Sequence, residues 1–127
     1  MNMEDINHSL NWFEIPVNDF ERAQKFYSEI YAFEMPDVQI GKNRFGFFPV
    51  QPGHIGGAII SGEGHVPSDK GSLIYLNGGD DLNVIYNRIE KAGGKVIQKK
   101  TLITSEHGYY ALFMDTEGNR VALHSMN

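Results

Sequence analysis

One carboxylate and one histidine have the types and positions that could support acid–base chemistry. Glu14 lies in the alternating run from Trp12 to Val17, and His124 lies in the last alternating run of the chain. A carboxylate placed in an apolar cavity has a raised pKa and can act as a general acid or base beside a histidine. One hypothesis is therefore a cofactor-free lyase or isomerase that moves a proton next to a carbonyl group, with Glu14 and His124 as catalytic residues.

The alternation predicts which way these side chains point. In the first run the odd-numbered positions are apolar, which places Trp12 and Glu14 together on the opposite face of a strand. In the last run Val121 and Leu123 are the apolar positions, so His124 points away from the core. We expect Glu14 and His124 to face one cavity, each from a different half of the chain. Two alternatives stay open, namely that Glu14 is a structural carboxylate and that His124 faces solvent.

The same face also fits a binding site without chemistry. Aromatic side chains are frequent on the predicted strands, and some of them could line a pocket for a flat or apolar ligand. In this second hypothesis Trp12 forms a wall of the pocket and Glu14 supplies a hydrogen-bond acceptor or a partner for a cation. The candidate ligand-binding residues are Trp12, Glu14, Tyr75, Tyr110 and His124.

The elements that would position these residues occur twice in the same order. A strand from Trp12 is followed by a helix capped at Asn18, whose apolar face is Phe20, Ala23, Phe26, Tyr27 and Ile30, and then by three strands. After a linker (61–70), a strand at 72–77 precedes a helix that begins at Asp80-Asp81 and ends at Gly93, and three more strands follow. This period of roughly 60 residues predicts two modules, at about 6–61 and about 71–127.

We predict an α+β fold in a single domain, 1–127. Each module has one helix for its sheet and is too small to bury that sheet alone. The two modules should therefore pack together and enclose a shared cleft. The paired glycines Gly56-Gly57 predict a bulge or a close approach of another group to the backbone.

The composition excludes several kinds of function. The net charge is −5, and no Lys or Arg cluster exceeds Lys99-Lys100, which argues against a nucleic-acid or membrane-surface partner. The absence of cysteine excludes thiolate catalysis, disulfides and iron–sulfur clusters. No apolar run has the length of a membrane span and no signal peptide is present, so we expect a cytoplasmic protein.

Five segments together resemble the vicinal oxygen chelate superfamily, the glyoxalase/bleomycin-resistance/dioxygenase fold. They are Phe13 to Asp19, Ala23 with Phe26-Tyr27, Gly56-Gly57-Ala58, Ile89 to Val96, and Asp115 to Asn119. The resemblance covers nearly the whole chain. It implies two tandem βαβββ modules in an incomplete barrel with a shared cavity, and often a homodimer. It does not imply one activity, because the superfamily includes isomerases, dioxygenases and metal-free drug-binding proteins.

The resemblance also implies a divalent metal in many members, but its ligand positions hold unsuitable residues here. These positions correspond to Trp12, to the segment 57–59, to the segment 72–74 and to Ala122, and none of them is a His, Glu or Gln. An indole has no lone pair to donate to a metal. We therefore predict no cofactor, and binding of a small organic molecule as the leading function. A metal-dependent glyoxalase or dioxygenase is less favoured, and a displaced metal site at Glu14 and His124 stays an alternative.

Overall fold

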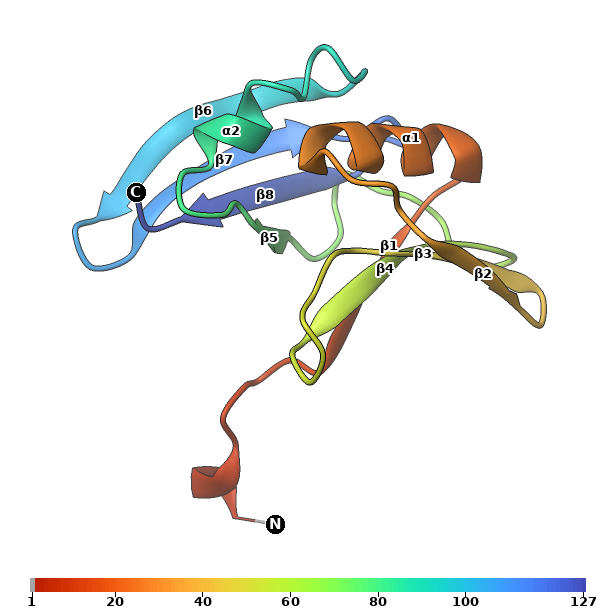
Figure 1. Cartoon of the computed structure of the whole chain (residues 1–127), viewed down its shortest axis with the longest axis horizontal. Coiled ribbons are helices and arrows are strands. Elements are labelled where there is room, and N and C mark those ends of the chain that lie inside the picture. The colour runs from red at the N-terminus through yellow and green to blue at the C-terminus, as the bar shows by residue number, and fades with distance from the viewer. Residues whose placement is uncertain (1) are drawn as a thin grey trace.

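The computed structural model describes residues 2–127 and contains two four-stranded β-sheets (Figure 1). The strand orders are β1-β4-β3-β2 and β5-β8-β7-β6, and in each sheet the first strand runs parallel to its neighbour. No helix within residues 2–127 is long and apolar enough to cross a membrane. The elements are η1 (Met3–Asp5), β1 (Trp12–Pro16), α1 (Phe20–Tyr31), β2 (Asp37–Ile40), β3 (Asn43–Phe47), β4 (Gly56–Ser61), β5 (Ile74–Asn77), α2 (Asn83–Tyr86), β6 (Lys95–Thr104), β7 (Gly108–Met114) and β8 (Arg120–Ser125).

This order confirms the two βαβββ modules predicted from the sequence. Module 1 comprises β1 to β4 with α1, and module 2 comprises β5 to β8 with α2. The register is equivalent in the two sheets, since β1 pairs with β4 as β5 pairs with β8. In Figure 1, α1 lies above the sheet of module 1, and α2 is drawn over the sheet of module 2.

Helix α1 forms as its apolar spacing predicts. The buried residues of the helix are the five predicted ones, Phe20, Ala23, Phe26, Tyr27 and Ile30. The predicted cap was wrong by one residue. The carboxylate of Asp19, not the side chain of Asn18, accepts the backbone N–H of Arg22 at 3.1 Å. The helix ends at Ala32, which adopts a left-handed conformation with φ 53°.

Helix α2 is much shorter than predicted. Only Asn83–Tyr86 is helical, and the segment up to Gly93 continues as turns, several with hydrogen bonds to the third preceding carbonyl. Asparagine and β-branched residues are weak helix formers, and here they occupy much of the first two turns. The apolar side chains Leu82, Ile85 and Ile89 are nevertheless buried, so tertiary packing preserves the predicted buried face. Gly93 has φ +107°, but it follows turns and not a helix, so the predicted helix end at Gly93 was wrong.

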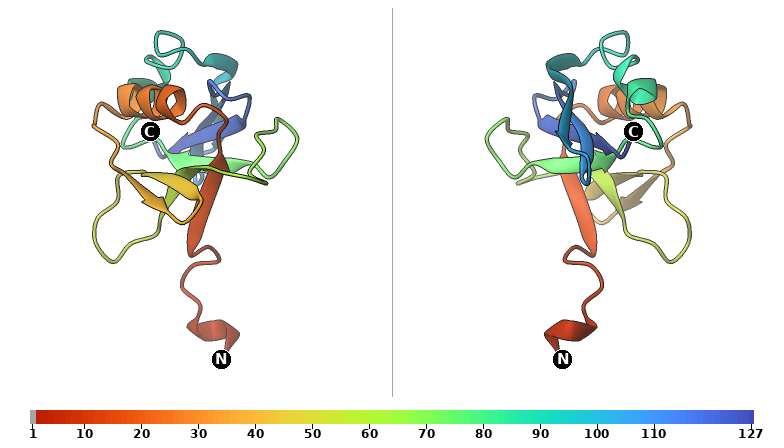
Figure 2. Two further views of the ribbon diagram at one scale, coloured as in Figure 1. Left: turned by 90° about the vertical axis from the view of Figure 1, so that its right-hand side faces the viewer. Right: turned by 90° about the vertical axis from the view of Figure 1, so that its left-hand side faces the viewer.

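The two modules share one apolar core, and α1 lies between them (Figures 1 and 2). The ring of Phe26 lies 6.0 Å from that of Phe113 on β7, measured between centroids. The next residue, Tyr27, lies 5.0 Å from Phe48 of module 1. A single helix therefore packs against aromatic residues of both modules.

A polar turn at 115–119, which we call the latch turn, joins module 2 to module 1. Asp115 is 5% exposed, and its carboxylate accepts the Tyr27 hydroxyl at 2.8 Å. It also accepts the backbone N–H groups of Glu117 and Asn119 and the Asn119 amide, at 2.8 to 2.9 Å. The Asn119 amide donates in addition to the carbonyl of Pro16 on β1 at 2.8 Å. Each of these polar groups is satisfied, as buried polar groups must be.

Glu117 of the latch turn binds the start of α1. Its side chain is 0% exposed and accepts the backbone N–H groups of Asn18 at 3.0 Å and Asp19 at 2.7 Å. It also pairs with Arg22 at 2.8 Å. Burial would raise the pKa of Glu117, but the hydrogen bonds from Arg22 and from the Asp19 backbone hold it below its usual range.

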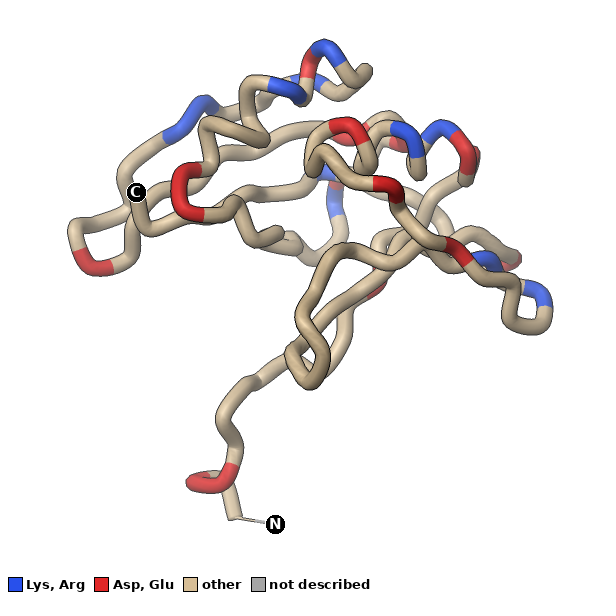
Figure 3. Tube along the Cα trace, viewed as in Figure 1, with Lys and Arg blue, Asp and Glu red and all other residues tan. Residues whose placement is uncertain are grey.

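Charged residues are distributed unevenly along the chain. Acidic and basic positions are interspersed on α1 and over much of module 2 (Figure 3). By contrast, the segments 45–62 and 71–79 contain no Asp, Glu, Lys or Arg. These two uncharged segments carry β4 and β5 and come from different modules.

Candidate functional site

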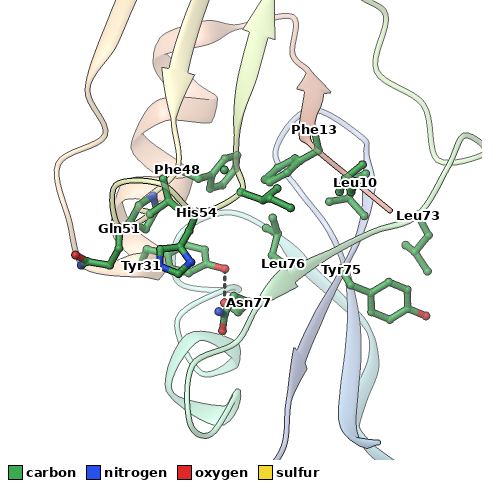
Figure 4. A pocket seen from close by; sticks show the side chains of 15 residues that line it. Leu10, Phe13, Tyr31, Phe48, Gln51, His54, Leu73, Tyr75, Leu76 and Asn77 are labelled. Carbon is green, nitrogen blue, oxygen red and sulfur yellow. Dashed lines mark hydrogen bonds between the residues drawn. The ribbon is translucent and has the colours of Figure 1, made fainter. Parts of the chain in front are cut away.

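The largest described cavity lies between the two modules, where the uncharged segments meet. Its volume is about 890 Å³, and both modules line it (Figure 4). Ligand pockets commonly have volumes of about 300 to 1,000 Å³ and mostly apolar walls. The lining residues are Leu10, Phe13, Tyr31, Phe48, Pro49, Val50, Gln51, His54, Ile55, Gly56, Leu73, Ile74, Tyr75, Leu76 and Asn77.

Aromatic packing fixes one wall of this cavity. The rings of Phe13 and Phe48 lie 5.4 Å apart between centroids, and Phe48 contacts Tyr31 edge-on at 6.3 Å. A Cβ atom on Gly57 would overlap the Phe13 ring, so the glycine allows this ring to lie flat on β4. The predicted close approach at the paired glycines is thereby confirmed.

The cavity has a polar end at the border between the modules. The Tyr31 hydroxyl at the end of α1 donates to the backbone carbonyl of Asn77 on β5, at 2.7 Å. The His54 ring lies at this same end, whereas Phe13 and Leu10 lie at the opposite end (Figure 4). Burial raises the pKa of Tyr31 well above its usual range, so its phenol stays neutral.

No Asp, Glu, Lys or Arg of residues 2–127 lines this cavity. The neighbouring segments 45–62 and 71–79 are uncharged, which explains that neutrality. The described arrangement has apolar walls that can surround an apolar body and polar side chains that can hydrogen-bond a polar group. It provides no pair of charged side chains for proton transfer.

The structure places the predicted ligand-binding residues in more than one location. Tyr75 lines the cavity, although its ring is 55% exposed and points away from the centre (Figure 4). Trp12 and Glu14 lie together on the open face of β1, as predicted, where the indole N–H approaches the carboxylate at 3.3 Å. Trp12 is 43% exposed and packs edge-on against Phe47, with centroids 6.2 Å apart. Neither Trp12 nor Glu14 lines the cavity.

Glu14 and His124 line two different small pockets. Glu14 and Arg120 line one of about 220 Å³, whereas His124 and Tyr75 line another of about 420 Å³. Arg120 and His124 are four residues apart on β8, about 13 Å at the usual rise of a strand. His124 Nε2 lies 2.6 Å from the carbonyl oxygen of His107, and Tyr110 is its register partner on β7. The structure therefore groups Tyr75, Tyr110 and His124, but does not bring Glu14 to them.

The residues at the family's metal-ligand positions do not fit a divalent metal. The side chains of Trp12 and Ala122 have no atom that can ligate a metal. The segment 57–59 consists of Gly57, Ala58 and Ile59, which are buried in β4. Across residues 2–127, no group of three or more His, Asp or Glu side chains lies close enough to hold a metal. Divalent sites with open coordination positions need two or three protein ligands, and the residues named above do not supply them.

Sequence reasoning missed the residues that shape the cavity. Phe13 lies on the apolar face of the first predicted strand, no role was predicted for His54, and Tyr31 lies one residue beyond the predicted helix face. The absence of charge over 45–62 and 71–79 was the signal that could have identified these segments as cavity walls.

Comparisons with known proteins agree with the architecture. A glyoxalase-like domain-containing protein of Didymella fabae is 30% identical over 123 residues, covering 93% of this chain and 94% of that protein. The structure of TnmS3, an antibiotic-binding protein from Streptomyces, matches with a TM-score of 0.67 and 24% identity, covering 95% and 97%. Glyoxalase I from Zea mays matches with a TM-score of 0.65 and 19% identity over 91% of this chain, which spans only 43% of the maize chain.

The chain also matches the model of one protein family. The model described as Glyoxalase/Bleomycin resistance protein/Dioxygenase superfamily matches residues 9–123. This span contains module 1, module 2 as far as Leu123, every residue that lines the cavity, and the latch turn. The chain therefore belongs to the glyoxalase/bleomycin resistance protein/dioxygenase superfamily.

Proposed function

We propose that this protein binds a small organic molecule in the cavity between its two modules, without the metal chemistry of many family members. The observation that carries the proposal is the 890 Å³ cavity with a wall of Phe13, Phe48 and Leu76 and a polar end at Tyr31. Such a cavity suits a ligand of several fused or linked rings, because apolar burial supplies affinity and a few polar groups supply orientation.

The fold has a precedent for the binding of a small molecule. TnmS3 is an antibiotic-binding protein, and it matches this chain over nearly the full length of both. This likeness supports a role in sequestering a small molecule. The acid–base alternative has less support, because Glu14 and His124 line separate pockets. A homodimer and a cytoplasmic location stay predictions.

A thermal-shift screen of metabolites and antibiotics tests this proposal. A ligand at a hundred times its Kd stabilises the folded state by about 2.7 kcal/mol, which raises the Tm by several degrees. We expect Ile55→Trp to abolish the shift, since Ile55 lines the cavity and is only partly buried, so that a larger side chain can enter the space.

The matched control is Trp12→Ala, which alters the open face of β1 outside the cavity. We expect this variant to keep the full ligand-induced shift. A shift that survives Ile55→Trp but disappears in Trp12→Ala would move the binding site to the face of Trp12 and Glu14 and contradict the proposal. Both variants are first compared without ligand, so that a change in basal stability is not mistaken for lost binding.

A further inference from the structure

The hydrogen-bonding state of Tyr31 limits what its hydroxyl can offer a ligand. Its only proton is donated to the Asn77 carbonyl at 2.7 Å. Within residues 2–127 no donor is bonded to the Tyr31 oxygen in return. A hydroxyl oxygen has two acceptor lone pairs, so this atom presents acceptors, and no donor, to the cavity.

The surroundings of this oxygen keep it in that state. Tyr31 is held by edge-on contacts to Phe33 and Phe48, with centroids 6.4 and 6.3 Å apart. The acceptor carbonyl belongs to β5, which is fixed to β8 by parallel pairing. The raised pKa of the buried phenol means that it does not ionise near neutral pH.

The rest of the lining disfavours a charged ligand. No Asp, Glu, Lys or Arg of the described chain lines the cavity, so a carboxylate or ammonium on a bound molecule would find no carboxylate, ammonium or guanidinium to pair with there. Burying an unpaired charge costs far more than burying a neutral polar group that is hydrogen-bonded. His54 also lines the cavity and lies at the same end as Tyr31 (Figure 4).

We propose that the cavity takes uncharged aromatic or polycyclic molecules that carry a hydroxyl or N–H group, and that the Tyr31 oxygen accepts the hydrogen bond from that group. This inference rests on the proposed function and specifies its ligand class. The apolar body lies against Phe13, Phe48 and Leu76, and the donor group points toward the end of α1.

A matched series of naphthalenes tests the ligand class. The probes are 2-naphthol, 2-methoxynaphthalene and 2-naphthoate, each measured by displacement of fluorescent N-phenyl-1-naphthylamine from the whole chain. We expect 2-naphthol to bind about five-fold tighter than its methyl ether, since the ether has lost the donated proton. We expect 2-naphthoate to bind more than about ten-fold more weakly than 2-naphthol.

Two variants test whether the Tyr31 oxygen causes the preference for 2-naphthol over its methyl ether. Tyr31→Phe removes the acceptor oxygen, and we expect the affinity ratio of naphthol to ether to fall to about one. The freed Asn77 carbonyl lies 2.7 Å behind the lost oxygen, so the ligand would have to move deeper to use it. Tyr86→Phe is the matched control, because it removes a tyrosine hydroxyl at the end of α2, outside the cavity, and the ratio should stay near five.

The outcomes separate this inference from the proposed function. If the reporter binds and Ile55→Trp abolishes its binding, the cavity is a binding site. With that result, a naphthol-to-ether ratio of one in the unaltered protein, or a ratio that Tyr31→Phe leaves at five, would overturn the inference alone. If none of the four compounds binds, the proposed function is overturned as well.

Discussion

Replacing Asp115 by alanine is expected to lower the free energy of unfolding by about 4 kcal/mol. The carboxylate accepts four hydrogen bonds, including one from the buried Tyr27 hydroxyl, and alanine would leave all four donors without a partner. Domains of this size are stabilised by about 5 to 15 kcal/mol in total, so the loss is a large fraction. The measurement is urea unfolding followed by circular dichroism at pH 7.

The control for this variant is Asp5→Ala, which removes an exposed carboxylate from η1 and should change stability by less than about 0.5 kcal/mol. Asp115→Asn keeps the shape and one acceptor oxygen, so its cost should fall between those of the other two variants. An Asp115→Ala protein as stable as the control would show that the latch turn does not hold the modules together.

Glu117→Gln is expected to cost about 3 kcal/mol at pH 7, because the neutral amide keeps one acceptor oxygen but loses the ion pair with Arg22. The cost should also depend on pH. The folded-state pKa of Glu117 is lowered, so its stabilising contribution is complete above the usual glutamate pKa and is lost as the pH falls through the folded-state value. The difference from the unaltered protein should be constant between pH 6 and 8 and shrink below about pH 4.

Urea unfolding at a series of pH values measures this difference. Glu106→Gln is the matched control, since Glu106 is exposed and lies in the turn between β6 and β7. A stability difference for Glu117→Gln that is unchanged at pH 3 would contradict the role of the carboxylate charge. The pH series also separates the charge of Glu117 from the shape of its side chain.

The fold could be predicted from the sequence because its signals are local and repeated. The spacing from Phe20 to Ile30 predicted α1, and the repeat of strand, helix and three strands predicted two modules. The short α2 was not predicted, because the same apolar residues are buried whether the segment forms a helix or a series of turns. The cap of α1 was misplaced by one residue, and the backbone N–H of Asn18 is bonded to Glu117, 99 residues further along the chain, which no local pattern indicates.

The site was harder to predict because it depends on parts of the chain that are far apart in the sequence. Alternation correctly put Trp12 beside Glu14, because that relation lies within one strand. Whether Glu14 meets His124 depends on how the sheets are set against each other, and no local pattern contains that information. The cavity likewise combines three parts of the chain, namely the end of α1, the segment that precedes β4, and β5. Taken singly, the side chains of these parts resemble ordinary core or loop residues.

The latch turn and the cavity are parts of one physical arrangement. The latch turn attaches module 2 to the start of α1 through Glu117, and Tyr31 attaches the end of α1 to β5. Helix α1 is therefore bonded to module 2 at both of its ends. Both attachments join the two modules that line the cavity.

Chemical-shift mapping of the uniformly ¹⁵N-labelled protein, titrated with the strongest ligand of the thermal-shift screen, tests the central claim most directly. If the ligand binds between the modules, the largest changes should fall on the amides of Leu10, Phe13, Ile55, Leu76 and Asn77, which lie around the cavity. Largest changes on Trp12, Glu14 and Phe47, with the cavity amides unaffected, would contradict it.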